Sequence, residues 1–252
     1  MSTTKVYKLL SGVEVESEFI TGNHLEIFSK QGTKNNKTKM LLALVKRIGD
    51  NKNVKLEDIQ KMPINDVTDL MIQLRQDCYD PEIAFVLEWE NQEKNKFKKE
   101  HKIELTDDFF EKQAPQKIVT SYEELEYEYD VELPVSKAKV RLNILTQGDL
   151  DKLGGTINLQ DVHLNTLLEW RKPRTITIDE NKEGKEVERP NKCDLKKLIA
   201  RDLSFLQKEV NLKEGKINTS YEFTHPTEEL AFLPKQSVDI VNSLGFLFPS
   251  LT

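Results

Sequence analysis

The residues that could carry chemistry in this chain are four histidines, two cysteines and several pairs of acidic residues. The histidines fall in four separate segments, and none has a second histidine three or four residues away, the spacing that places two metal ligands on one helix face. Cys78 stands between Asp77 and Asp80, whose negative charge raises the pKa of a thiol and disfavours the reactive thiolate. The pattern indicates no catalytic residue and no metal ligand, and we expect the protein not to be an enzyme.

Nucleotide or nucleic-acid chemistry would need a glycine-rich phosphate loop or a basic surface. Neither of the common glycine motifs for phosphate occurs, so we predict no bound cofactor. Residues 170–174, Trp-Arg-Lys-Pro-Arg, combine an aromatic ring with three cations, as nucleic-acid contacts do. They also fit the cationic end of a helix, and the acid-rich residues 179–188 that follow weaken their field. We favour the helix end and expect no nucleic-acid partner.

Charge and hydropathy point to a folded protein with protein partners. The 252 residues include 37 Lys and Arg against 43 Asp and Glu, and the net charge of -6 argues against binding to nucleic acid or to anionic membranes. The longest apolar stretch, Met40–Val45, is far below the roughly 20 residues that cross a bilayer, and no charged-then-apolar leader opens the chain. The two cysteines form no close pair. We therefore expect no membrane partner and a reducing cytoplasm.

Apolar spacing predicts the elements that would position these residues. Over residues 13–19 apolar residues alternate with glutamates, which predicts a strand paired with residues 5–10 through a turn at Ser11-Gly12. Asn65 or Asp66 is placed to cap a later helix. The other elements predicted in the first 90 residues are helices over 23–28, 39–49, 56–62 and 67–74 and a strand over 82–89.

The same order of elements then begins again. The strand, the turn before it and the helix after it match the start of the chain, and a second helix followed by a strand matches at a slightly different offset. We predict an α+β fold of two related halves that arose by internal duplication, each a β-hairpin, helices and then a strand or hairpin. The matched residues are Thr21 with Thr146, Ser11 with Ser136, Val15 with Val140 and Leu25 with Leu150, at an offset of 125, and Asp69 with Asp202, at an offset of 133.

This repeat divides the chain into three expected parts. Residues 1–90 form the first repeat, residues 91–130 a connector with a strand and an acidic, aromatic segment, and residues 131–252 the second repeat. The second repeat carries an added polar hairpin tip over residues 179–192. Its tail is a short helix over 237–244 and an apolar end, which must be buried on the protein itself or on a neighbour. The residues predicted to bind a partner are Phe246, Leu247, Phe248 and Leu251.

Residues 65–75, Asn-Asp-Val-Thr-Asp-Leu-Met-Ile-Gln-Leu-Arg, are followed by a turn and a strand. This segment resembles a stretch of the baseplate hub subunit and hub-assembly family of T-even-like contractile-tailed bacteriophages. Residues 10–25 and 40–44 resemble the earlier part of the same pattern, so the resemblance covers about the first 90 residues. Some members carry a cysteine pair after the Leu-Arg helix, whereas Glu88-Trp89-Glu90 occupies that region here, so no metal knuckle is carried over.

The resemblance implies a late viral protein without catalytic activity. It would be a structural component of the tail baseplate in the virion, or an assembly factor in the host cytoplasm, and its partners would be other tail or baseplate proteins. A homo-oligomer also stays open. Two alternatives remain: a cytoplasmic interaction module unrelated to phages that docks through its apolar end, and a metal-dependent nucleic-acid enzyme. The enzyme would require a cleft in which several acidic side chains converge.

Overall fold

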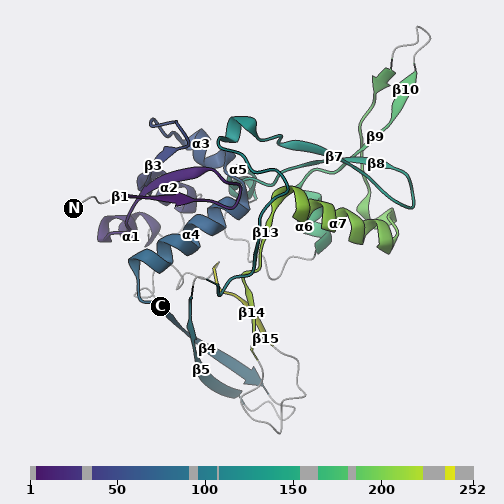
Figure 1. The fold of residues 1–252 in the computed structure, drawn as a ribbon. Helices are drawn as coiled ribbons and strands as arrows, with labels where there is room; N and C mark the ends of the chain where they lie inside the picture. The colour runs from purple at the N-terminus through teal and green to yellow at the C-terminus, as the bar shows by residue number, and fades with distance from the viewer. Residues whose placement is uncertain are drawn as a thin grey trace.

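The structure, a computed structural model, describes residues 4–29, 36–90, 96–106, 108–153, 164–180, 186–223 and 236–241. The protein is α+β, with helices packed against several small antiparallel sheets, and this confirms the predicted fold class (Figure 1). The predicted partner-binding residues lie outside the described residues, namely Phe246, Leu247, Phe248 and Leu251.

The first half of the molecule (residues 4–104) is a three-stranded sheet, four helices and a long hairpin. Its elements are β1 (Thr4–Lys8), β2 (Glu14–Glu18), α1 (Gly22–Ser29), α2 (Asn36–Leu44), β3 (Val45–Ile48), α3 (Leu56–Lys61), α4 (Ile64–Cys78), β4 (Glu82–Glu90) and β5 (Lys96–Glu104). Strand β2 lies between β1 and β3, and β4 pairs with β5 along its full length. The alternation of apolar and acidic residues over 13–19 thus marks a strand whose one face is buried, as predicted.

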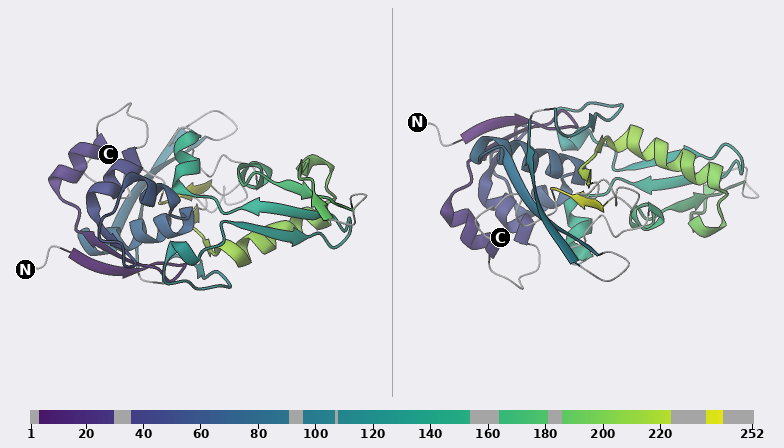
Figure 2. Two further views of the ribbon diagram at one scale, coloured as in Figure 1. Left: turned by 90° about the horizontal axis from the view of Figure 1, so that it is seen from above. Right: turned by 90° about the horizontal axis from the view of Figure 1, so that it is seen from below.

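The second half (residues 128–241) follows a short linking region that holds β6 (Lys112–Gln113) and η1 (Tyr122–Glu124). Its elements are β7 (Glu128–Glu132), β8 (Lys139–Asn143), α5 (Gln147–Lys152), α6 (Leu164–Trp170), β9 (Arg174–Ile176), β10 (Ile178–Glu180), β11 (Glu186–Glu188), β12 (Asn191–Lys192), η3 (Leu195–Lys197), α7 (Ala200–Glu214), β13 (Lys216–Ile217), β14 (Ser220–Phe223) and β15 (Gln236–Asp239). The sheet order is β12-β9-β8-β7, and β10–β11 forms the predicted polar hairpin. Figure 2 places the two sheets at opposite ends of an elongated molecule.

Two of the predicted helices are wrong in part. The helix predicted over 39–49 ends at Leu44, because Val45–Ile48 pairs with β2 as a strand and buries Val45 and Ile48 in the core. The helix predicted over 237–244 is also wrong where the chain is described, since residues 236–239 form β15 against β14. In both cases a partner strand distant in sequence overrides the local apolar spacing.

The apolar side chains gather in two cores. The first lies between the β1–β2–β3 sheet and α4, and the second between the β7–β8–β9 sheet and α7. The last hairpin does not join the second core, because Phe223 of β14 and the adjoining Ile240 and Val241 are buried in the first. Phe223 packs edge-on against His101 of β5, with ring centroids 4.9 Å apart. The end of the second half is therefore built into the first.

The order of elements is similar in the two halves, although the second half has added strands. In each, a hairpin is followed by two helices and a strand that returns to the second hairpin strand; a 15-residue helix and another hairpin come next. Val15 pairs with Ile48 in the first sheet, and Val140 pairs with Thr175 in the second. The turns also match, because Gly12 and Lys137 both have positive φ, of 97° and 56°. The turn and the second hairpin strand keep the offset of 125, whereas the paired residues Ile48 and Thr175 differ by 127.

The predicted offset for the second helix needs correction. Asp202 is the third residue of α7, whereas Asp69 is the sixth residue of α4 and Asp66 the third. Asp66, at an offset of 136, is therefore the structural counterpart of Asp202. The sequence comparison favoured Asp69 because a leucine follows both it and Asp202.

Candidate interaction surfaces

The clearest polar site in the first half joins α4 to the turn of the first hairpin. The carboxylate of Asp66 is buried and accepts hydrogen bonds from the Ser11 amide at 2.9 Å, from the Ser11 hydroxyl, and from the Tyr122 hydroxyl at 2.8 Å. Burial raises the pKa of Asp66, and the bonds from Ser11 and Tyr122 act in the opposite direction. Asp66 was predicted as a candidate helix cap, but α4 begins at Ile64 and Asp66 binds the hairpin turn instead.

The second half contains the same kind of contact. Asp202 near the start of α7 accepts hydrogen bonds from the amides of Val135 at 2.9 Å and Ser136 at 3.0 Å, both in the turn of the β7–β8 hairpin. Burial opposes ionisation of Asp202, but the hydrogen bonds from Val135 and Ser136 outweigh it, and the pKa of Asp202 is lowered. In both halves, then, a helix carboxylate fixes the hairpin turn in place.

The two halves meet through main-chain hydrogen bonds. The Ile64 amide donates to the Leu145 carbonyl at 3.0 Å, and the Gln147 amide donates to the Met62 carbonyl at 2.9 Å. These two bonds form an antiparallel bridge centred on Pro63 and Thr146. The residue before α4 in the first half thus pairs with the residue before α5 in the second.

Side chains surround this bridge on both sides. Thr38 of α2 donates its hydroxyl hydrogen to Asp151 of α5 at 2.8 Å, and the Gln60 amide reaches the same carboxylate at 3.5 Å. Gly148 lies so close that a side chain there would come within 3.0 Å of the Gln60 carbonyl oxygen. Asn65 donates to the Gly215 carbonyl at 2.9 Å, at the end of α7. The contact between the halves is therefore close-packed and largely hydrogen-bonded.

A buried ion pair supports the second half beside this contact. Arg171 donates two hydrogen bonds to Glu214, at 2.7 and 2.8 Å, and a third to the Leu167 carbonyl. Tyr129 also donates to Glu214 at 2.8 Å. Although burial opposes the charge on Arg171, the Glu214 carboxylate more than compensates and raises the pKa of Arg171.

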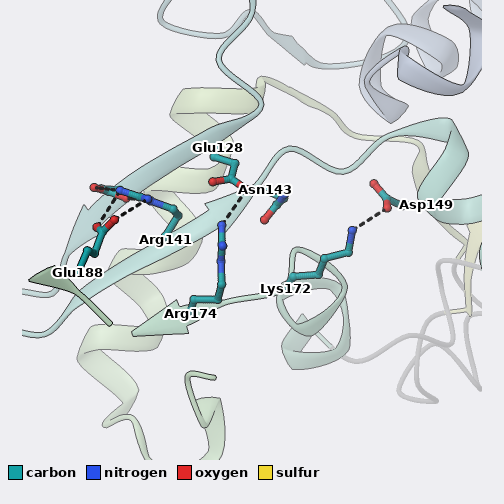
Figure 3. A network of polar contacts seen from close by, with 8 residues as sticks. Glu128, Arg141, Asn143, Asp149, Lys172, Arg174 and Glu188 are labelled. Atoms are coloured by element: carbon teal, nitrogen blue, oxygen red, sulfur yellow. Dashed lines mark hydrogen bonds and ion pairs between the residues drawn. The ribbon is translucent and has the colours of Figure 1, made fainter. Parts of the chain in front are cut away.

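The exposed face of the second sheet carries a network of ion pairs (Figure 3). Arg141 binds Asp130 through two nitrogens and also reaches Glu188 at 3.1 Å. Arg174 lies 2.8 Å from Glu128, and Lys172 lies 3.2 Å from Asp149. Since Arg171 pairs with Glu214, each of the three cations in the 170–174 cluster has a carboxylate partner. The predicted interpretation of this cluster as the end of α6 fits these positions.

The histidines and cysteines that the structure describes lie on separate segments of the fold. His24 accepts a hydrogen bond from the Thr21 amide at 3.0 Å through Nδ1, and burial lowers its pKa. Burial raises the pKa of the Cys78 thiol, and Asp77 adds to this effect, as predicted. His163 and His225 lie outside the described residues. Within the described ranges, no three His, Cys, Asp or Glu side chains are grouped closely enough to hold a metal ion.

A hollow of about 910 Å³, lined by both polar and apolar side chains, lies beside the bridge between the halves. It opens between α3, α5 and the segment that contains Tyr122 and Tyr127. Its charged lining mixes both signs, with Lys61 and Lys152 beside Glu57, Asp58 and Glu123. Such a lining suits hydrogen bonding to a polar chain better than concentration of one charge.

No protein-family model matches the chain, and no curated protein or solved structure matches it either. Across the described residues, no helix is both long enough and apolar enough to span a membrane.

Proposed function

We propose that the protein is a non-catalytic component or assembly factor of a contractile phage tail baseplate and works through contacts with other tail proteins. The observation that carries this proposal is the contact between the two segments that resemble the hub family. Residues 10–25 supply the hairpin turn, β2 and the start of α1, residues 65–75 lie within α4, and Asp66 joins them through Ser11. The two segments that resemble the hub family are thus in direct contact, which supports the proposal.

Two projecting hairpins support a role in contacts with other proteins. The β4–β5 and β10–β11 hairpins extend away from the body on different sides (Figure 1). Each is a two-stranded sheet, and among the described residues no third strand covers either edge. The β4–β5 hairpin buries Ile83, Leu87 and Ile103 in the first core, and the open edges of both hairpins can pair with a strand of a neighbour. Such arms serve a scaffold better than they serve a catalytic cleft.

The setting is tested in the phage or prophage genome that encodes the chain. We expect genes for tail sheath, tail tube and tape-measure proteins beside it. We also expect a deletion of the gene to leave filled heads without attached tails in electron micrographs of the lysate, and the intact gene on a plasmid to restore tails. Normal contractile tails in the deletion lysate would rule out the baseplate role and leave the cytoplasmic interaction module.

The apolar end of the chain offers a sharper test of the same proposal. Replacing the four predicted contact residues by serine should prevent the plasmid copy from restoring tails, while leaving the melting temperature unchanged. A matched control replaces Ser250 and Thr252 by alanine and should restore tails fully. Full restoration by the serine variant would show that the end of the chain is not the docking segment. The substituted residues are Phe246, Leu247, Phe248 and Leu251.

A further inference from the structure

The contact between the two halves joins unlike surfaces. The first half contributes residues 62–64, before α4, and the second contributes residues 145–147, before α5. Each half contains a counterpart of both segments. The head-to-tail contact uses one of these two segments from each half and does not use the other. The second half retains its counterpart of residues 62–64, and the first half retains its counterpart of residues 145–147.

The counterpart in the second half is residues 198–200, which we call the Ile199 edge. Ile199 precedes α7 with φ −70° and ψ 153°, and Pro63 precedes α4 with φ −55° and ψ 142°. The Leu198 amide donates to a carbonyl three residues earlier at 3.2 Å, and so does the Met62 amide. The backbone that pairs across the halves at Pro63 is thus repeated at Ile199.

The counterpart in the first half is residues 20–22, which we call the Thr21 edge. Thr21 precedes α1 as Thr146 precedes α5, and the carbonyl of each accepts from the amide three residues later, at 3.0 and 3.1 Å. The side chain of that later residue accepts from the threonine amide in both cases, through His24 Nδ1 at 3.0 Å and Asp149 Oδ2 at 3.2 Å. The backbone at Thr21 is therefore held by the same cap geometry as the backbone at Thr146.

Both edges are open to solvent in the described part of the chain. The Ile199 side chain is 49% exposed, although isoleucine is usually buried, and Thr21 and Gly22 are exposed as well. No described residue bonds to the Gly22 or Ala200 amide or to the Ile20 or Leu198 carbonyl. The two edges lie at opposite ends of the molecule, because the far end of α7 contacts Asn65 of the first half.

We propose that copies of this chain associate head to tail, with the Thr21 edge of one copy paired to the Ile199 edge of the next. The pairing reproduces the bridge between Pro63 and Thr146. At the offset of 125, Glu26 corresponds to Asp151, and at the offset of 136, Lys196 corresponds to Gln60. The contact between the Gln60 amide and the Asp151 carboxylate would therefore be replaced by an ion pair between Lys196 and Glu26. Both Glu26 and Lys196 are exposed. Charge complementarity thus favours a second copy as the occupant of each edge.

A head-to-tail contact leaves both edges open again at the ends of every assembly. It therefore builds a ring if the rotation between copies closes, and a helical filament if it does not. This association concerns the isolated protein and does not rest on the phage setting, so sedimentation tests it independently of the tail phenotype.

The main-chain bond is tested with Ala200→Pro. Ala200 is the first residue of α7, where proline is tolerated, and the extended Ile199 backbone suits the residue before a proline. The substitution removes only the amide hydrogen that corresponds to the Ile64 donor. We expect sedimentation velocity over a concentration series to show wild-type association and an about tenfold weaker association of Ala200→Pro. Ala200→Ser, which keeps the amide hydrogen, should associate like the wild type.

The ion pair is tested by exchanging its charges. Lys196→Glu alone places two acids against each other, and Glu26→Lys alone places two cations together, so each variant should sediment as a monomer. An equimolar mixture restores opposite charges at every contact and should associate. Lys208→Glu, an exposed reversal on α7 away from both edges, should behave like the wild type.

Three results would each overturn the proposal. The first is a wild-type protein that stays monomeric at about 100 μM, a concentration well above the micromolar range of weak specific contacts. The others are an association that Ala200→Pro leaves unchanged and an equimolar mixture that associates no better than its components. Circular dichroism of every variant shows whether the fold is retained. If Ala200→Pro does not fold, the charge-exchange variants still test the proposal.

Discussion

Asp66 and Asp202 hold the same position in two helices of equal length, and each accepts hydrogen bonds from the hairpin turn that begins its own half. The partners differ, since Asp66 also binds two hydroxyl groups and Asp202 binds two main-chain amides. The shared position and the shared role support the duplication that we propose for the origin of the two halves.

Asp66→Ala is expected to destabilise the protein by about 2 kcal/mol, because it leaves the buried Ser11 amide and the Tyr122 hydroxyl without their acceptor. Asp66→Asn keeps one acceptor oxygen and should cost less. The free energy of unfolding in urea measures both effects. Asp50→Ala, at an exposed turn, is the control and should change stability by less than about 0.5 kcal/mol. Equal stability of Asp66→Ala and the wild type would mean that the turn is held by other contacts.

The stability of the protein should fall as the pH drops below about 6.5, partly because of His24. Burial lowers the pKa of folded His24, and its neutral Nδ1 accepts the Thr21 amide, so the unfolded chain binds the proton first. The loss therefore begins near the unfolded pKa and is complete below the folded one. His24→Asp should reduce this loss between pH 7.5 and 5.5, since an ionised Asp accepts the same bond, as Asp149 does in the second half. An unchanged pH dependence of the urea midpoint in His24→Asp would contradict this role.

Arg171→Met should destabilise the protein by about 3 to 5 kcal/mol, because it leaves the buried Glu214 carboxylate without its cation. Adding Glu214→Gln should recover part of the loss, since the glutamine oxygen still accepts from Tyr129 and no buried charge remains. A double-mutant cycle from urea unfolding gives the coupling energy. Strictly additive losses would show that Arg171 acts through packing alone.

The two hairpin turns should respond in opposite ways to substitution at their left-handed residues. Lys137→Gly should stabilise the protein by up to about 1 kcal/mol, because Lys137 has a φ of 56° that glycine adopts without strain. Gly12→Ala should destabilise it by more than about 1 kcal/mol, since φ is 97° and the added Cβ would meet the Val119 carbonyl oxygen at 2.9 Å. Thermal melting checks both variants. A stabilising Gly12→Ala would show that this turn relaxes.

Local sequence patterns could predict the hairpins and most of the helices. The alternation around Val15 marks β2, and the spacing of Leu70 and Leu74 marks the buried side of α4. The strand nature of Val45–Ile48 could not be predicted, because these residues continue the spacing of α2 and differ only through their pairing with β2. Pairing with a strand that is distant in sequence determines whether such a segment forms a helix or a strand.

The candidate contacts could be predicted much less well. The bridge between the halves uses main-chain atoms at Pro63 and Thr146, and main-chain hydrogen bonds can form with almost any residue type, so the sequence does not reveal them. The Ile199 edge had one usable indication, an isoleucine shortly before the charged pair Arg201-Asp202. The sequence comparison matched Thr21 with Thr146, but this match suggested only duplication, because the sequence does not show what Thr146 pairs with.

The burial of Phe223, Ile240 and Val241 in the first core bears on how the protein forms during translation. Those three side chains are synthesised after almost everything else in that core. Until then the nascent chain holds an incomplete core, in which His101 lacks its contact with the Phe223 ring, and such a chain is prone to aggregate. Completion of the first core therefore waits for the synthesis of residues 223–241, and a product truncated before them should be degraded rather than accumulate as a folded first half.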